Sequence, residues 1–392
     1  MTYPSQHLLG KQTTLVDLEG DVHSLMHKFR EAEPVSFVHS INAWLVTRHD
    51  DCCLVMRDTE TYTVDHPGFT TAQVIGPTML SFDGQLHKQH RRPFEAPFRK
   101  TAIKESFDRK VNKHINALID KFEELDGTEL MKSFAGPISV LTMQSALGME
   151  NVSISHALSF NNSIIDTVTA LTAGKPKDHI GSEAFSAFRD SLTPELNSDP
   201  NTSLLASAHA NPGDLNDDQL LSNAALLLIG GIETTEGMIG NALYHLLSDL
   251  DLLERIKSDT SLIPKLIEES LRLEPAAGVI DRFATKDVVL RGRTIKKGDL
   301  VRVSLSAANR DPNVFERPDK FDLSRTNLKS HVTFAQGPHV CLGLHLARLE
   351  AIKAIEIILK RIPKLRLNSE YSTSAKPKGL VFRKPDKLWV EW

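Results

Sequence analysis

The feature that most constrains the fold is a long helical pattern over residues 216–247. Asn216 opens the pattern, two aspartates follow in the first turn, and Gln219 takes its place in a capping box, so the helix start is well defined. At 1.5 Å per residue such a helix is about 50 Å long. Because residues 224–232 are almost wholly apolar, the pattern predicts a helix buried on all sides within a large helical core.

Two features inside this helix have no structural explanation. The adjacent glycines Gly230 and Gly231 cost about 1 kcal/mol each relative to alanine. The carboxylate of Glu233 costs more still in apolar surroundings unless it is paired or reaches water. A catalytic site explains both, because glycine lets a ligand approach the backbone and the acid–alcohol pair of Glu233 and Thr234 can relay protons. The alternative is a tolerated polar patch that faces water.

The second constrained stretch is F-A-Q-G-P-H-V-C-L-G, residues 334–343. Gly337-Pro338 breaks the backbone, and a run of helix formers begins after Gly343. Cys341 therefore lies where a turn leads into a helix N-terminus, and the free N–H groups and helix dipole there favour a thiolate. A thiolate in this position is a suitable ligand for iron. The alternative is a buried, inert cysteine before a surface helix.

This loop resembles the haem-binding loop of the cytochrome P-450 superfamily, F-G-x-G-x-H-x-C-x-G. Ala335 departs from that pattern, since it stands where the family usually has glycine. The resemblance implies that Cys341 is the axial thiolate of haem b, a ligand whose electron donation favours O–O cleavage. The positions that match are Phe334, Gly337, His339, Cys341 and Gly343.

The glycine-rich helix segment G-G-I-E-T-T resembles the family's oxygen-activating motif, A-G-x-[DE]-T. Gly231, Glu233 and Thr234 match, whereas Gly230 replaces the usual alanine. The resemblance implies that Thr234 hydrogen-bonds dioxygen, that Glu233 helps to bring protons from solvent, and that Gly231 lies at the haem.

Three further basic side chains are candidates for binding the haem. His87 and Arg91 are four residues apart, so they share one face of a helix and could both reach one anion. Without further information, such a pair describes a solvated helix face equally well. The family has D-x-x-x-H-x-x-x-R here, which implies that both bind a haem propionate, a carboxylate that arginine binds through charge-assisted bonds. Arg282, on a predicted strand over residues 279–284, matches the family's propionate-binding arginine.

A structural motif precedes the cysteine loop by about seventy residues. Glu269 and Arg272 can form an ion pair on one face of a helix predicted over 264–273, although exposed pairs contribute only about 0–1 kcal/mol. The pair matches the family's E-x-x-R motif, and the resemblance implies a buried pair that binds Arg325. Other predicted elements are a hairpin at 35–38 and 43–46, a loop at 60–80 that covers a pocket or lies on the surface, and a loop at 197–214.

Composition limits the classes of protein that this chain can belong to. Its 392 residues are 41% hydrophobic and 24% charged, and no Gly/Ser/Pro linker divides them, so we expect one domain, 1–392. The net charge of −4 argues against nucleic acid as a partner. The N-terminus has no signal-peptide pattern, and no run of eighteen apolar residues occurs, so we expect no membrane partner. Three cysteines, two of them adjacent, favour a reducing cytoplasm.

The resemblance to the soluble bacterial members implies a mostly helical α+β fold, a triangular prism with a large helical lobe and a smaller β-rich lobe. It implies monooxygenation of an apolar small molecule by dioxygen. No fused reductase is expected, because the chain has no G-x-G-x-x-G fold and no cysteine cluster, so electrons come from a ferredoxin or flavodoxin with its reductase. The alternatives are a peroxide-driven haem-thiolate peroxygenase and a non-catalytic haem-binding protein.

Overall fold

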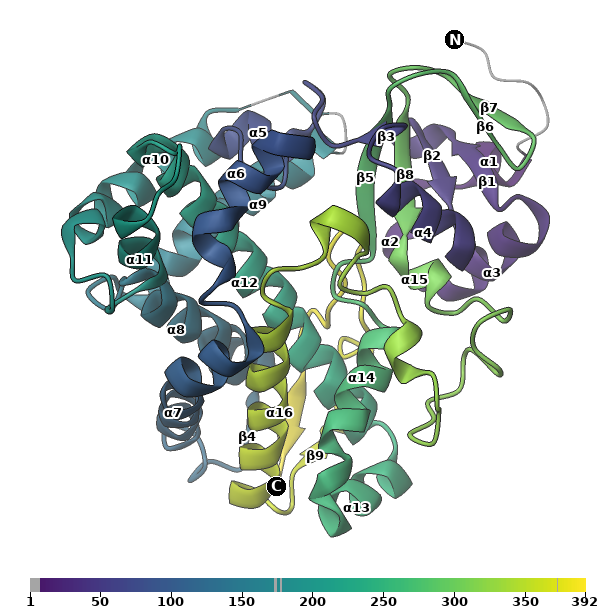
Figure 1. Ribbon diagram of the computed structural model, residues 1–392. Coiled ribbons are helices and arrows are strands. Elements are labelled where there is room, and N and C mark those ends of the chain that lie inside the picture. The colour runs from purple at the N-terminus through teal and green to yellow at the C-terminus, as the bar shows by residue number, and fades with distance from the viewer. Residues whose placement is uncertain (1–7, 173–174, 177, 372) are drawn as a thin grey trace. The chain divides into compact units, whose positions relative to one another are not determined.

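A computed structural model of the chain describes residues 8–172, 175–176, 178–371 and 373–392. The fold is mostly helical, with a smaller share of sheet (Figure 1), as predicted. The chain forms two compact units, each built from segments that are distant in sequence. Unit 1 comprises Met1–Val64, Asn241–Cys341 and Thr373–Asp386, and unit 2 comprises Asp65–Gly240, Leu342–Ser372 and Lys387–Trp392.

Unit 1 is organised around a five-stranded sheet in the order β1-β2-β8-β5-β3, in which only β2 and β8 are parallel. The predicted hairpin is confirmed: Val35 pairs with Val46, and Asn42 turns the chain with a left-handed φ of 46°. Trp44 and Val303 pack into one core of the unit, and Leu45 packs into another, so both faces of the sheet are covered. The strands are β1 Val35–Val38, β2 Ala43–Val46, β3 Tyr62–Thr63, β5 Val279–Ala284 and β8 Leu300–Ser304.

The remaining elements of unit 1 are short helices and one further hairpin. The helices are α1 Leu8–Gln12, α2 Leu15–Glu19, α3 His23–Ala32, α4 His49–Arg57, α13 Leu250–Ser258, α14 Ile263–Leu273 and α15 Leu305–Ala308. The hairpin is formed by β6 Val288–Leu290 and β7 Arg293–Ile295. The 3₁₀ turns are η1 His39–Ile41, η4 Thr260–Leu262, η5 Leu328–Ser330 and η6 Gly337–His339.

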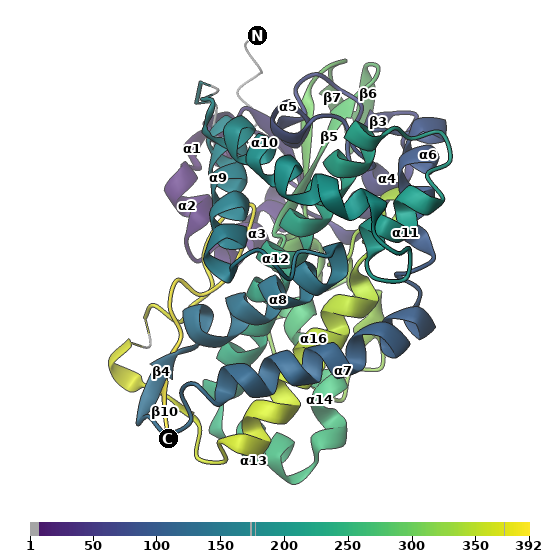
Figure 2. The ribbon, with the colours of Figure 1, turned by 90° about the vertical axis from the view of Figure 1, so that its left-hand side faces the viewer.

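Unit 2 is helical apart from a three-stranded sheet of β4 Gly127–Glu129, β10 Trp389–Glu391 and β9 Arg366–Leu367. In it, α7 Lys100–Ile119 packs against both α8 Gly136–Leu147 and α16 Leu344–Arg361 (Figure 2). The other helices are α5 Thr70–Ile75, α6 Gly84–Glu95, α9 Ile154–Thr172, α10 Ile180–Leu192 and α11 Leu204–Ala210. Shorter turns are the π-helical η2 Met131–Ala135, η3 Thr193–Asn197 and η7 Ser369–Tyr371.

The long helix α12, Asp217–Leu247, runs from unit 2 into unit 1. Its predicted capping box is confirmed, because the Gln219 N–H donates to Asn216 Oδ1 at 2.9 Å and the Asn216 N–H donates to Gln219 Oε1 at 3.0 Å. The expectation that residues 224–232 are buried on all sides is wrong, since Gly230 is exposed. The helix thus leaves one position open within its apolar stretch. Among the described residues, no helix has the length and apolarity needed to cross a membrane.

Two predicted loops contain short helices. Residues 60–80 include β3 and α5, and α5 buries Val74 and Ile75 while it packs against α9 and α10. Residues 197–214 include α11, whose N-cap Ser203 accepts the Ala206 N–H at 3.1 Å. Helices this short show too little periodicity to be recognised in the sequence, and tertiary packing stabilises them.

Candidate active site

The loop before α16 holds Cys341 at the surface of its unit. The cysteine is exposed and forms no disulfide, so the alternative of a buried cysteine is wrong. The Cys341 N–H donates to Phe334 O at 2.9 Å, and the Val340 N–H donates to Gly337 O at 3.2 Å. These bonds close the loop on itself. An exposed sulfur on a fixed backbone fits the requirement for an iron ligand.

Two residues of the loop have left-handed backbone conformations. Ala335 has φ 58° and Gly337 has φ 73°. A Cβ on Gly337 would lie 2.9 Å from the Met56 carbonyl oxygen on α4, so glycine permits the close approach of this helix. For Ala335 the conformation costs roughly 1–2 kcal/mol, which explains why glycine is usual at this position of the motif. The Arg57 guanidinium, also on α4, donates to Gln336 Oε1 and holds the loop from the same side.

The other predicted haem-binding residues of unit 1 are two residues of this loop and Arg282 on β5. His339 is buried within η6, and Phe334 is half-buried. Arg282 is buried on β5, where its Nη1 donates to Asp281 O at 2.8 Å. Of these residues, the structure joins Phe334 directly to Cys341 through the backbone bond described above.

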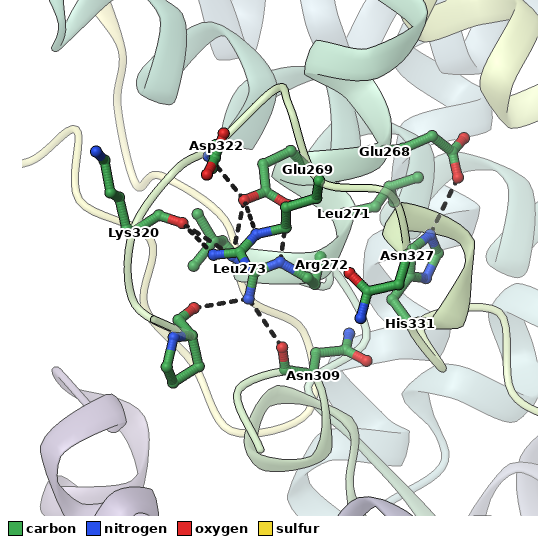
Figure 3. A network of polar contacts seen from close by, with 12 residues as sticks. Glu268, Glu269, Leu271, Arg272, Leu273, Asn309, Lys320, Asp322, Asn327 and His331 are labelled. Carbon is green, nitrogen blue, oxygen red and sulfur yellow. Dashed lines mark hydrogen bonds and ion pairs between the residues drawn. The ribbon is translucent and has the colours of Figure 1, made fainter. Parts of the chain in front are cut away.

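A buried ionic network supports the segment that leads to the loop (Figure 3). Glu269 and Arg272 on α14 are fully buried and form a bidentate pair, with distances of 2.7 and 2.8 Å. Arg325 Nε donates to the same carboxylate at 2.9 Å, which confirms the predicted third member. The guanidinium of Arg272 also donates to the carbonyl oxygens of Asn309, Pro318 and Lys320. The pair is therefore structural, as predicted.

Asn309 connects this network to the start of the cysteine loop. Its Oδ1 accepts the Val332 N–H at 2.7 Å, and its Nδ2 donates to Thr333 Oγ1 at 2.8 Å. Thr333 in turn donates to the Leu271 carbonyl on α14 at 2.7 Å. The Asn309 side chain thus fixes the two residues that immediately precede Phe334.

In unit 2, α6 carries both members of the predicted propionate pair. His87 is buried, and its Nδ1 lies 2.7 Å from Met79 O. Arg91 Nε donates to Glu95 Oε1 at 3.2 Å. Because Glu95 is exposed, that pair contributes only about 0–1 kcal/mol, so Arg91 could exchange it for another anion at small cost.

The glycine-rich segment of α12 has one open and one packed position. A Cβ on Gly230 would meet no atom within 4 Å, whereas a Cβ on Gly231 would lie 2.3 Å from Met143 Sδ on α8. Gly230 therefore provides the space that a ligand needs, and Gly231 permits close packing of two helices. Thr234 Oγ1 donates to Gly230 O at 2.5 Å, and the Glu233 side chain is buried. The assignment of Gly231 to haem binding remains a prediction.

Sequence reasoning missed one buried polar residue on the same helix. Asn223 is fully buried and contacts Met79 and His90. Its only signal in the sequence is an amide side chain at the edge of an apolar run, which implies a hydrogen-bond partner but does not identify it.

Comparisons with known proteins agree with these motifs. The Cytochrome P-450 family model matches residues 175–387. Cytochrome P-450 107B1 of Saccharopolyspora erythraea is 31% identical, over 88% of this chain and 89% of the relative. The mycinamicin IV hydroxylase/epoxidase of Micromonospora griseorubida is 30% identical, over 95% and 97%. The crystal structure of the BioI cytochrome P-450 with a hexadec-9Z-enoic acid-ligated acyl carrier protein has a TM-score of 0.85 and 26% identity, over 95% and 98%.

Proposed function

The chain belongs to the cytochrome P-450 family of haem monooxygenases, and from this premise we propose that it oxidises an apolar small molecule with electrons from a separate protein. The reaction is a hydroxylation or oxidative dealkylation in which one atom of dioxygen enters the substrate and the other leaves as water. Members of the family bind haem b, and when bound this group supplies the activation of dioxygen.

The observation that carries the proposal is the exposed thiol of Cys341 in a closed loop. We assign Cys341 as the residue that would bind the haem iron, because the two hydrogen bonds fix the backbone of its loop and the following helix N-terminus favours its thiolate form. We assign Arg282, His87 and Arg91 to the propionates. All three side chains can present N–H donors, the groups that a carboxylate accepts.

Thr234 and Glu233 would deliver protons to the site. The Thr234 hydroxyl has one hydrogen, which it donates to Gly230 O. The Thr234 oxygen keeps two lone pairs, so it can accept a hydrogen bond from a group that lies in the open position beside Gly230. Glu233, one residue earlier on α12, carries a carboxylate that can exchange protons. We propose that Glu233 helps to bring protons from solvent and that Thr234 presents its hydroxyl at the open position beside Gly230.

An apolar substrate is supported by the residues around the open position and by two relatives. Gly230 lies in a stretch of α12 made of leucine, isoleucine, alanine and glycine, so the surface beside it offers little to a charged molecule. One relative is named for mycinamicin IV, and one structural neighbour holds hexadec-9Z-enoic acid on an acyl carrier protein. We therefore expect a largely apolar compound of low molecular weight. Because none of the three cysteines forms a disulfide, we further propose that the protein works in the reducing cytoplasm.

The electron donor is proposed to be a ferredoxin or flavodoxin with its reductase. The sequence contains neither a dinucleotide-binding motif nor a cysteine cluster for an iron–sulfur centre, so this chain does not carry the electrons itself.

The test begins with a screen for compounds that shift the visible spectrum of the haem-loaded protein. Each compound that shifts it is then incubated with ¹⁸O₂, NADPH, ferredoxin and ferredoxin reductase, and separately with hydrogen peroxide alone. We expect product with one ¹⁸O atom in the first mixture. Product only with peroxide would establish the peroxygenase alternative. A spectral shift without product in either mixture would favour a non-catalytic haem protein.

A further inference from the structure

Asn223, on α12, lies at the centre of a buried polar network within unit 2. Its Oδ1 is 2.9 Å from the Met79 N–H nitrogen, and its Nδ2 is 2.7 Å from Gln219 O and 2.9 Å from His90 Nδ1. The side chain is 0% exposed. Both the oxygen and the NH₂ group of this buried amide therefore have hydrogen-bond partners, which are the Met79 N–H, the Gln219 carbonyl and the His90 ring.

The two backbone partners determine the orientation of the Asn223 amide. A backbone N–H can only donate, so the atom that faces Met79 must be the oxygen. The Gln219 carbonyl can only accept, so the atom that faces it must be the NH₂ group. That group also faces His90, whose Nδ1 must then be an unprotonated acceptor. Burial lowers the pKa of His90, which favours this neutral ring with its hydrogen on Nε2.

His87 must have the opposite arrangement. Its Nδ1 lies 2.7 Å from Met79 O, and because a carbonyl only accepts, Nδ1 carries a hydrogen. Met79 is thus held on both sides of its Cα, by Asn223 at its N–H and by His87 at its carbonyl. The orientation of the His87 ring depends on the position of Met79, and the position of Met79 depends on Asn223.

We propose that Asn223 is a positioning residue of the haem site, which orients His87 through Met79. The inference rests on the proposed role of His87 at a haem propionate. Asn223 also precedes Gly230 by seven residues and Thr234 by eleven, spacings that put the three on one face of α12. One face of α12 therefore carries both Asn223, which binds Met79 in the loop after α5, and Thr234, the threonine of the proposed oxygen site.

The first test measures the transfer of haem from the loaded protein to excess apomyoglobin. Asn223→Leu removes all three bonds at similar side-chain volume. We expect haem release to accelerate about tenfold, the factor for losing one buried hydrogen bond, which here is the bond from His87 to the propionate. If Asn223 acts through His87, the substitution has no further effect in a His87→Leu background. Equal acceleration in both backgrounds would overturn the proposal. Asn161→Leu, which alters a fully buried asparagine on α9, is the matched control and should leave release unchanged.

The second test observes the histidine ring nitrogens by ¹⁵N NMR in the haem-loaded ferrous CO form. We expect His90 to show a protonated Nε2 and a bare Nδ1. Asn223→Asp keeps the acceptor for Met79 but replaces the donor to His90 by an acceptor, so Nδ1 of His90 should gain a hydrogen while His87 stays unchanged. An unaltered His90 signal would overturn the assignment. Neither test requires turnover, so a failure of the proposed monooxygenase activity would not affect them.

Discussion

At the scale of single residues, the proposed function depends most on Cys341. Its sulfur is exposed on a loop that two backbone hydrogen bonds close. We predict that Cys341→Ser abolishes the thiolate spectrum of the reduced CO complex, because a serine hydroxyl cannot supply a thiolate ligand. Cys53→Ser, at a buried cysteine on α4, should retain that spectrum. A normal spectrum in the Cys341 variant would show that the ligand is another residue.

Thr234 should control how efficiently electrons are used. Its hydroxyl is held on α12 by the carbonyl of Gly230. We predict that Thr234→Ala raises the hydrogen peroxide released per NADPH consumed about tenfold, because removing one hydrogen-bonding group at such a site costs one to a few kcal/mol. Thr235→Ala is the adjacent control and should leave this ratio unchanged. Unchanged coupling in the Thr234 variant would favour peroxide-driven chemistry or another proton path.

Glu233→Gln tests the acid separately from the alcohol. The amide keeps the size of the side chain but cannot exchange a proton near neutral pH. We predict that turnover slows by about 10²-fold, the lower end of what a general acid–base group contributes, while peroxide release stays low. Turnover at the wild-type rate would exclude Glu233 from the proton path.

Residue types and spacing predicted the turn and the helix start around Cys341, and the chemistry assigned to this loop stays a prediction. Cys341 lies between a turn and a helix N-terminus as predicted, because turn residues and a helix start are local features of the sequence. The left-handed φ of Ala335 and the partners of Asn223 depend on contacts between segments far apart in the chain. A single sequence carries no direct record of such contacts.

At the scale of elements, strong and regular patterns predicted the structure best. β5 has the predicted bounds, and α14 begins one residue before its predicted start. The short helices α5 and α11 were missed, since each gains its stability from packing and not from its own sequence. The burial of the E-x-x-R pair was predicted from the family motif alone. As an isolated pattern, the same spacing is equally typical of an exposed ion pair on a helix surface.

The ionic network on α14 should contribute strongly to stability. Among the described residues, Glu269 is the one carboxylate that pairs with both Arg272 and Arg325, and it is fully buried. We predict that Glu269→Gln lowers the free energy of unfolding by about 3–5 kcal/mol, because it leaves buried guanidinium groups without a counter-charge. Circular dichroism during urea unfolding measures the change. The control is Glu391→Gln, in an exposed pair with Arg366, where a loss above about 1 kcal/mol would be unexpected.

The C-terminal part of α12 should make stability depend on pH. Burial lowers the pKa of His245 to about 4, from an ordinary value of 6.5. The unfolded chain therefore binds a proton below pH 6.5 that the folded chain does not bind until about pH 4, so stability falls as the pH decreases between these values. We predict that His245→Phe reduces this slope. His27→Phe, at an exposed histidine of α3, should leave the slope unchanged, and an equal change in both variants would exclude His245 as the cause.

At the scale of the whole molecule, the charge is unevenly distributed along the chain. The net charge is −4, yet residues 91–110 contain seven basic and three acidic residues. This segment runs from the second half of α6 into α7, and five of its basic residues are exposed. They are Arg92, Arg99, Lys100, Lys104 and Arg109. The alternative to a docking site is a solvated helix face without a protein partner.

The basic segment should accelerate electron delivery by an acidic ferredoxin. Opposite charges steer the encounter of two proteins, and salt suppresses this effect because the Debye length is about 10 Å at 0.1 M. We predict that Arg99→Glu with Lys104→Glu slows reduction by ferredoxin about tenfold at low salt and leaves substrate binding unchanged. Lys286→Glu with Lys297→Glu changes the net charge equally at exposed sites outside this segment, so it separates local docking from overall charge. Stopped-flow reduction at several ionic strengths measures both variants. If the two double variants slow reduction equally, or if neither does, the segment 91–110 is not the docking site.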